Sequence, residues 1–173
     1  SYSRAMDALV IEPLNLSATT LAPSPHAAKS YRCVSPVVVW LDSRPAYRAA
    51  SGGYFSIARG LIQFSHRVYD TDFLSRSSRS ALTTVEVASA SYALGGRIRQ
   101  VQVGESMIAA AWETGDLAGY RSVLGHCLDG QGTVLVLNNT AISQRTMDEF
   151  AEALLRLMVD QPPISVAPVT RQA

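Results

Sequence analysis

The chain has 173 residues, of which 47% are hydrophobic, and this is enough to bury one core of ordinary size. Its 15 basic and 14 acidic residues leave a net charge of +1, which excludes the strongly basic surface of a nucleic-acid-binding protein. No apolar run approaches the roughly 20 residues that cross a bilayer, so the sequence predicts no membrane span. The two cysteines, Cys33 and Cys127, make no disulfide framework, and periplasmic, secreted and cytoplasmic locations all stay open.

The first 90 residues predict mostly helices and loops. Apolar residues recur at helical spacing in three stretches, Ser3–Leu14, Tyr54–Tyr69 and Leu74–Thr83. Pro13 ends the first of these helices, and Ser75 is placed to cap the third. Between the first two helices the chain is rich in proline and irregular. Within that region Val37–Leu41 is either a strand or a buried loop.

Residues 91–140 predict an antiparallel sheet. Four apolar or alternating runs follow one another here, Tyr92–Val103, Met107–Thr114, Tyr120–Leu128 and Thr133–Asn138. Glycine-bearing turns separate them, at Gly104-Glu105, at Gly115-Asp116 with Gly119, and at Asp129 to Gly132. Connections this short leave no room for crossover helices, so neighbouring strands run antiparallel. Alternation is poor in Thr133–Asn138, which indicates a strand covered on both faces.

A strong helix closes the chain. Ser143 is its predicted N-cap, and Gln144–Val159 carries apolar residues at i, i+3, i+4 and i+7. Pro162-Pro163 ends the pattern, so residues 162–173 are expected to form a tail. The fold class predicted for residues 1–161 is therefore α+β, in one domain. Helices flank its antiparallel sheet, and a C-terminal helix (143–160) packs on that sheet.

Five stretches, in this order, resemble one enzyme superfamily. They are Ile11–Thr19 (IEPLNLSAT, similar to "F-EPLGM-DT"), Ser51–Phe64 (SGGYFSIARGLIQF, similar to "AGGL-STA-DLA-F"), Tyr92–Ile98 (YALGGRI, similar to "YGLGW"), Trp112–Ser122 (WETGDLAGYRS, similar to "HTGGLPGFSS") and Gly132–Asn139 (GTVLVLNN, similar to "G-GVVVLTN"). Together they span most of the chain. It resembles the C-terminal half of the serine β-lactamase and penicillin-binding-protein superfamily, in its class C and esterase-like branch, which implies an incomplete β-lactamase/transpeptidase-like fold.

The resemblance implies a serine hydrolase that acts on a small-molecule ester or amide through an acyl-enzyme, without a cofactor or metal. The family's substrate-binding motif, Lys/His-Thr/Ser-Gly, maps onto Glu113-Thr114-Gly115. Thr114 would offer its hydroxyl to the substrate, and Gly115 would let the substrate approach the strand. The backbone N–H of Asp116 would be an oxyanion donor. Trp112, directly before the motif, is interpreted either as a pocket wall or as core.

The sequence departs from the family in two ways. Glu113 stands where the family places a cation, and its carboxylate would repel the acidic group of a β-lactam, so esters, lactones, amines or neutral amides fit better. The sequence also contains no Ser-x-x-Lys, because its one lysine, Lys29, follows His26 by three positions. The nucleophile and the family's tyrosine motif are therefore expected on a segment upstream of Ser1, and this chain alone is not expected to turn over substrate.

The family sheet also contains two strands from the start of its chain, beside the last strand. Without them Thr133–Asn138 is expected to be an open edge that pairs with a partner, either an N-terminal segment of the same precursor or a second copy. Two alternative functions stay open. One is a non-catalytic binding or interaction module with the same fold, and the other is a small α/β dimer whose resemblance to the family is fortuitous.

The remaining candidates favour structural roles. His126 and Cys127 are adjacent on a predicted strand, so their side chains point to opposite faces and cannot form a dyad. His66 and Asp70 share a helix face but have no third partner that would suggest a metal site. Ser51-Gly52-Gly53 lacks the Lys-Ser/Thr of a phosphate-binding loop and is interpreted as a helix-entry turn.

Overall fold

The computed structural model describes residues 1–34, 37–40 and 49–160 of the chain. Its helices are α1 (Tyr2–Met6), which continues as a π-helical turn (Asp7–Ile11), then α2 (Ala49–Gly52), α3 (Ala58–Asp70), α4 (Arg76–Thr83) and α5 (Gln144–Asp160). Its strands are β1 (Tyr31–Val34), β2 (Val37–Trp40), β3 (Val85–Val87), β4 (Tyr92–Ala93), β5 (Gly96–Val103), β6 (Ser106–Leu117), β7 (Tyr120–Cys127) and β8 (Thr133–Asn138).

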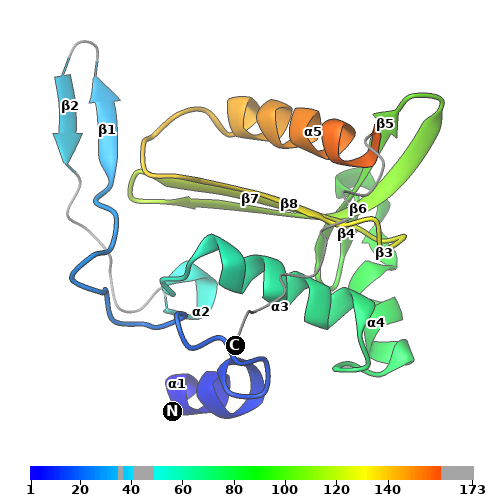
Figure 1. Cartoon of the computed structure of the whole chain (residues 1–173), viewed down its shortest axis with the longest axis horizontal. Helices are drawn as coiled ribbons and strands as arrows, with labels where there is room; N and C mark the ends of the chain where they lie inside the picture. Colours follow the sequence, from blue (N-terminus) through cyan, green and yellow to red (C-terminus); the bar gives the residue numbers. More distant parts are fainter. Residues whose placement is uncertain (35–36, 41–48, 161–173) are drawn as a thin grey trace, which may run out of the picture.

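Strands β3 to β8 form one antiparallel sheet in which spatial order follows chain order. The sheet lies between two helices, with α3 along one face and α5 along the other (Figure 1). The sequence-based prediction of an antiparallel sheet flanked by helices, with the C-terminal helix packed on it, is confirmed. Strand β8 also has a helix on each side, as its poor alternation indicated.

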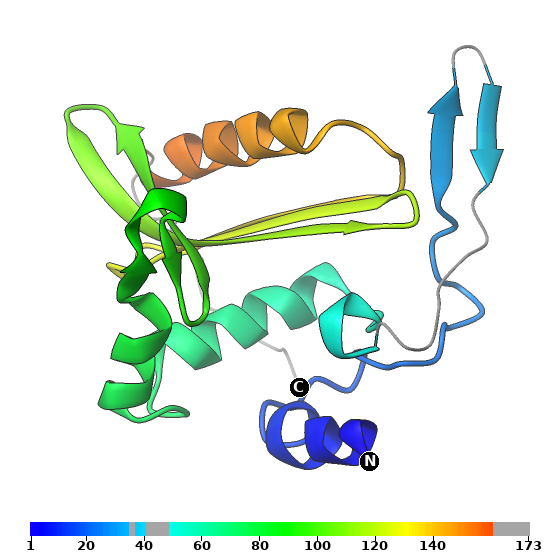
Figure 2. The same ribbon diagram turned by 180° about the vertical axis from the view of Figure 1, so that it is seen from behind.

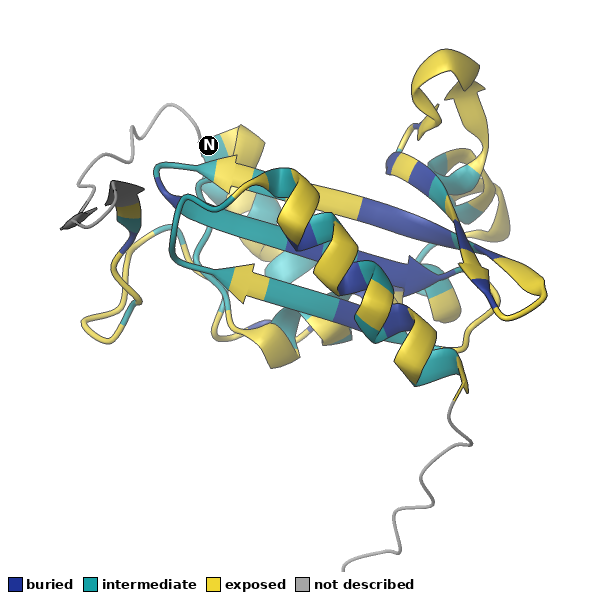
Figure 3. Cartoon of the chain, turned by 90° about the horizontal axis from the view of Figure 1, so that it is seen from above, coloured by how far each residue is buried: buried dark blue, intermediate teal, exposed yellow. Residues whose placement is uncertain are grey.

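The main core lies between α5 and the sheet. Ser143 caps α5, because its Oγ accepts a hydrogen bond from the Thr146 N–H at 3.0 Å. The helix buries Met147, Ala151 and Leu155 against the sheet, and its outer face stays exposed (Figure 3). Burying a side chain such as Leu155 contributes roughly 1.5–3 kcal/mol, so this interface accounts for much of the attachment of α5.

A smaller core lies on the α3 side. Leu14, Leu16 and Val68 form its buried centre, and the Gln63 side chain donates to the Leu14 carbonyl at 2.8 Å. These contacts hold the segment after α1 against α3. The predicted helix over Leu74–Thr83 is confirmed as α4, and its cap is Ser75, whose Oγ accepts from the Ser78 N–H at 3.1 Å.

The helix predicted over Tyr54–Tyr69 is wrong at its start. Helix α3 begins at Ala58, and Ile57 before it has extended backbone angles. The reason is a tertiary contact: Phe55 and Thr20 exchange two backbone hydrogen bonds, at 2.8 and 2.9 Å. Residues paired in this way cannot also make helical hydrogen bonds.

Three strand predictions also need correction. The run predicted as one strand over Tyr92–Val103 is two strands, β4 and β5, joined by a turn at Leu94-Gly95. Gly115-Asp116, predicted as part of a turn, lies inside β6, and the turn falls at Ala118-Gly119, both with positive φ. The short strand β3 was not predicted.

The alternative of a strand for Val37–Leu41 is the correct one over Val37–Trp40. Here β1 and β2 form a hairpin that stands clear of the main sheet, as both Figure 1 and Figure 2 show. Its base is held next to the end of β8, because the backbone N–H of Tyr31 donates a hydrogen bond to the Asn139 carbonyl at 2.7 Å. Leu41, Pro162-Pro163 and the predicted tail (162–173) lie outside the described residues. No helix in the described part of the chain is long and apolar enough to cross a membrane.

Candidate functional site

Strand β6 is paired on both sides along only part of its length. Strand β7 pairs with it from Ala110 to Leu117, whereas β5 pairs with it from Ser106 to Trp112 and reaches no further. The segment Glu113–Leu117 therefore has no strand partner on the β5 side among the described residues. This free edge coincides with the motif that the sequence analysis singled out.

The register shows which backbone groups face the free edge. The Leu128 N–H donates to the Ala109 carbonyl at 2.9 Å, so Ala109 directs its backbone groups toward β7. Hydrogen-bonding direction alternates along an antiparallel strand, so Thr114 and Asp116 direct their N–H and C=O groups to the β5 side. Those groups are available to an extended ligand that lies along the edge.

Side chains on this strand alternate between the two faces of the sheet. Trp112, Thr114 and Asp116 lie on the α5 face, and Glu113 lies on the α3 face. The indole of Trp112 is only 2% exposed within the main core, and its Nε1–H donates to Asp148 Oδ1 at 3.1 Å. The Arg99 guanidinium lies over the same ring, 5.0 Å from its centroid.

A cavity of about 530 Å³ opens beside the free edge on the α5 face. It lies between β5, β6 and the first turn of α5. Its polar lining includes Arg97, Arg99, Thr114, Gln144 and Asp148, and Trp112 forms part of its wall. Its volume is within the usual range for small-molecule sites. Trp112 thus belongs to the core and also borders this cavity.

The carboxylate of Glu113 has an unusual environment. It lies against the backbone of Gly96, where a Cβ would overlap its oxygens, and Gly96 itself has φ +133°. Burial raises the pKa of Glu113 to about 7, and the nearby Arg97 guanidinium opposes part of that rise. The pKa of the Tyr69 hydroxyl is also raised, first by burial and then by the Glu113 charge.

The rest of the motif segment is held from the β7 side. The Asp116 carboxylate forms an ion pair with Arg121, whose Nε–H donates to the Ile142 carbonyl at 3.1 Å. This links the end of β6 to the segment that leads into α5. Gly115 faces Ser122, whose hydroxyl fills the space that a Cβ at Gly115 would need. The Asp116 side chain is thereby anchored while its backbone N–H stays at the free edge.

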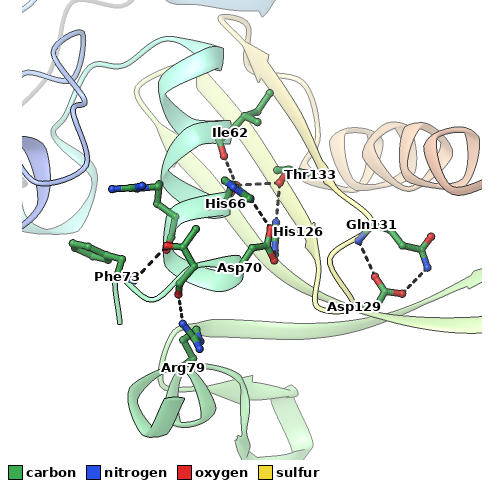
Figure 4. Close-up of polar contacts among 12 residues, drawn as sticks. Ile62, His66, Asp70, Phe73, Arg79, His126, Asp129, Gln131 and Thr133 are labelled. Carbon is green, nitrogen blue, oxygen red and sulfur yellow. Dashed lines mark hydrogen bonds and ion pairs between the residues drawn. The ribbon is translucent and has the colours of Figure 1, made fainter. Parts of the chain in front are cut away.

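A second polar cluster joins α3 to the sheet (Figure 4). Asp70 bridges two histidines, His66 Nδ1 at 2.9 Å and His126 Nε2 at 3.1 Å. His126 is fully buried, and its Nδ1 lies 2.8 Å from Thr133 Oγ1, which in turn lies 3.1 Å from Ser65 Oγ. The His66–Asp70 pair was predicted from helical spacing, but the contact of His126 with Asp70 was not, because these two residues are 56 positions apart in the sequence.

This cluster does not form a nucleophile dyad or a metal centre. Cys127 lies in the α5-side core, on the opposite face of β7 from His126, as strand alternation predicted. Burial raises the pKa of its thiol to about 11, with smaller contributions from Asp129 and Asp70, which disfavours the reactive thiolate. Within the described ranges, no three His, Cys, Asp or Glu side chains gather closely enough to hold a metal ion.

The fold is similar to that of two solved structures among those that match. The D-stereospecific amidohydrolase of a Streptomyces species superposes with a TM-score of 0.67 at 20% identity over 85% of this chain. The D-amino acid amidase of Ochrobactrum anthropi SV3, solved with D-phenylalanine, superposes with a TM-score of 0.64 at 14% identity over 91% of the chain. The chain has the β-lactamase/transpeptidase-like fold. It spans about half the length of these structures, 47% and 51%.

Both neighbours belong to the penicillin-binding-protein/β-lactamase-like superfamily. No family model and no curated protein sequence matches the chain. At these sequence identities the structural similarity shows the β-lactamase/transpeptidase-like fold and does not show the activity. Of the five residues expected at the site, Glu113 to Asp116 form the free edge and Trp112 precedes it. Gly96, Arg97 and Gln144 border the same region and were not foreseen.

Proposed function

We propose that the chain is part of a β-lactamase-like serine hydrolase that cleaves a small ester or amide through an acyl-enzyme. The observation that carries this proposal is the free edge at Glu113–Leu117, where the backbone groups of Thr114 and Asp116 face outward beside a cavity. Two neighbours with the same fold are amidohydrolases, which supports an amide as substrate.

In the proposed reaction a serine oxygen attacks the substrate carbonyl, and the amine or alcohol leaves with a proton. Water then hydrolyses the resulting acyl-enzyme ester and restores the serine. The Asp116 N–H would stabilise the oxyanion of each tetrahedral intermediate, and donors of this kind contribute about 3–4 kcal/mol where they have been removed. The Thr114 hydroxyl and the strand edge would orient the substrate.

The nucleophile must come from a Ser-x-x-Lys segment, which this sequence lacks. We propose that an N-terminal segment of the same precursor supplies it and also pairs with β8, the last strand in the order of the described sheet. Edge-to-edge pairing with a second copy is the alternative occupant of β8. Substrates with a free carboxylate on the α3 side of the motif fit poorly, because the Glu113 carboxyl group lies on that face of β6.

The second candidate function is a non-catalytic binding module with the same fold. Glu113 favours it, because this carboxyl group replaces the cation that the family's substrate-binding motif carries. A module of this kind would keep the free edge and its cavity and would bind without turnover.

One experiment separates the two functions. Denaturing and native mass spectrometry of the purified material come first, followed by assays with p-nitrophenyl esters and with amides of the same acyl groups. A second species that carries Ser-x-x-Lys, together with hydrolysis that a fluorophosphonate probe blocks, is expected for the hydrolase. A single species of 18.6 kDa without hydrolysis would refute catalysis by this chain and leave the binding module.

A further inference from the structure

A carboxylate without a partner lies beside the free edge, on the α3 face of the sheet. Glu113 precedes Thr114 on β6 and is exposed, so a ligand in solvent can reach its side chain. Within residues 1–34, 37–40 and 49–160, the Glu113 carboxylate forms no ion pair and no hydrogen bond. The Asp116 carboxylate at the same edge is already paired with Arg121. Glu113 is therefore the uncompensated negative group that this end of β6 offers to a ligand.

The position of this carboxylate is defined by the backbone of β5. Gly96 begins β5, and its missing Cβ leaves the space that the oxygens of Glu113 fill. The φ of Gly96 is +133°, a conformation that side chains other than hydrogen rarely adopt, so the space depends on glycine at this position. A carboxylate placed in this way loses little conformational entropy when a ligand binds to it.

The nearest cation does not neutralise Glu113. Burial raises the pKa of Glu113 to about 7, and the Arg97 guanidinium offsets only part of that rise. Arg97 is paired with Trp112, and directly opposed residues of neighbouring strands share a face, so Arg97 lies on the α5 face. Its guanidinium there lies 4.9 Å from the centre of the Tyr92 ring. A cation on the α3 face would therefore have Glu113 to itself.

The groups that α3 and β7 bring to this face do not compete for such a cation. The Tyr69 ring stacks on His126, with 5.0 Å between the ring centres. His126 and His66 both contact the Asp70 carboxylate, which is thereby occupied. Burial, and after it the Glu113 charge, raises the pKa of the Tyr69 hydroxyl, so this group is neutral at neutral pH.

These surroundings select the chemistry of the ligand. An anionic group would be repelled by the Glu113 carboxylate, and a neutral group would leave its charge uncompensated. A metal ion needs several ligands of this kind, and the described residues bring no three of them together. A primary ammonium group carries one positive charge and three N–H donors, which suits a single carboxylate that only accepts hydrogen bonds.

We propose that Glu113 forms a subsite for a primary ammonium group, so that the substrate is an ester or amide with a free amino group on the α3 side of the strand edge. This inference rests on the proposed function and deepens it, because it names the charged group by which the substrate is recognised. Glu113 is a specificity-determining residue in this scheme, and the reacting carbonyl still lies at the Asp116 N–H.

The test is a binding measurement on the purified chain with a matched pair of ligands, 3-phenylpropan-1-amine and 3-phenylpropan-1-ol. Titrations followed by ¹⁵N NMR report on the backbone amides of Glu113 and Thr114. At about pH 8 the amine is expected to bind about tenfold more tightly than the alcohol, the difference typical of one charge-assisted hydrogen bond.

The pH dependence is a second readout that needs no variant. With a pKa of about 7, the ionised fraction of Glu113 rises from about one tenth at pH 6 to about nine tenths at pH 8. The amine stays protonated over this range, because its pKa is close to that of lysine, about 10.4. Its affinity should therefore rise about tenfold between these pH values, whereas the affinity for the alcohol should stay constant.

The variant Glu113→Gln keeps the shape of the side chain but removes its charge, so it should bind both ligands equally at either pH. Glu105→Gln is the matched control, because Glu105 is an exposed carboxylate in the turn between β5 and β6, at the other end of β6. This variant should keep both the preference for the amine and its pH dependence.

Three results would each overturn the inference: equal affinities for the two ligands at about pH 8, an affinity for the amine that does not rise with pH, or a preference that survives Glu113→Gln. The measurement needs no turnover. Preference for the amine without hydrolysis in any sample would leave the subsite standing and refute only the hydrolase, and hydrolysis without that preference would refute only the subsite.

Discussion

Trp112 provides the sharpest test of how the site is built, because its ring could serve the ligand, the fold or both. The indole is 2% exposed and packs in the main core with Val101, Val123 and Met147. A tryptophan of this kind buries roughly 150–250 Å², which corresponds to about 4–6 kcal/mol at 25 cal/mol per Å², an upper bound on transfer alone. We expect Trp112→Ala to lower the free energy of unfolding by about 3–5 kcal/mol.

Urea unfolding followed by circular dichroism measures this loss. Trp112→Phe is a milder variant that keeps an aromatic ring but loses part of the side-chain volume and the Nε1–H bond to Asp148, and we expect it to lose about 1–2 kcal/mol. Leu157→Ala is the control, because Leu157 is 59% exposed on the outer face of α5 and should change stability by less than about 0.5 kcal/mol. A loss for Trp112→Ala no larger than that of the control would refute the assignment of Trp112 to the core.

Three further predictions follow from the geometry of the sheet. The folded pKa of Glu113 is raised to about 7, so the contribution of this group to stability is full below the unfolded pKa of about 4.5 and is lost as pH rises through 7. Glu113→Gln should flatten this fall of stability with pH in urea unfolding measured across that range. Equal pH profiles for the two proteins would contradict the prediction. Gly96→Ala should lower the free energy of unfolding by at least about 2 kcal/mol in thermal melts, because φ at Gly96 is +133° and the Glu113 carboxylate occupies the space of the new Cβ. Gly104→Ala is the control, because nothing lies near its Cβ position, and it should cost about 1 kcal/mol. His126→Ala should cost about 2–4 kcal/mol, because it removes the buried partner of Asp70 and one of the two partners of Thr133. A loss no larger than that of His66→Ala, whose side chain is 60% exposed, would show that the buried part of the cluster contributes nothing.

The local sequence pattern correctly predicted the elements whose structure depends on neighbouring residues in the chain. The bounds of β8 are those of the apolar run between Gly132 and Asn139, and the Ser75 cap of α4 follows from serine chemistry alone. The errors occur where distant residues intervene. The start of α3 depends on the pairing of Phe55 with Thr20, and Gly115 lies in a strand because it pairs with Ser122 of β7.

The site was predictable only in part for the same reason. The motif at Glu113–Asp116 was found by resemblance, and the chemistry expected of it stays a prediction. The edge of this motif is free because β5 begins at Gly96 and does not extend alongside it, and the local sequence pattern does not show where β5 begins.

Strand β6 loses one of its two neighbouring strands after Trp112. From Ala110 to Trp112 it is paired with both β5 and β7, and from Glu113 to Leu117 it is paired with β7 alone. Substitutions between Glu113 and Leu117 that face a ligand disturb few core contacts, so they change the stability of the fold little. Substitutions between Ala110 and Trp112, where both edges of β6 are paired, lower stability more. A site with this geometry can change which ligand it accepts while its scaffold stays constant, and under the proposed function Glu113, at a position where the resembling family carries a cation, is a change of that kind.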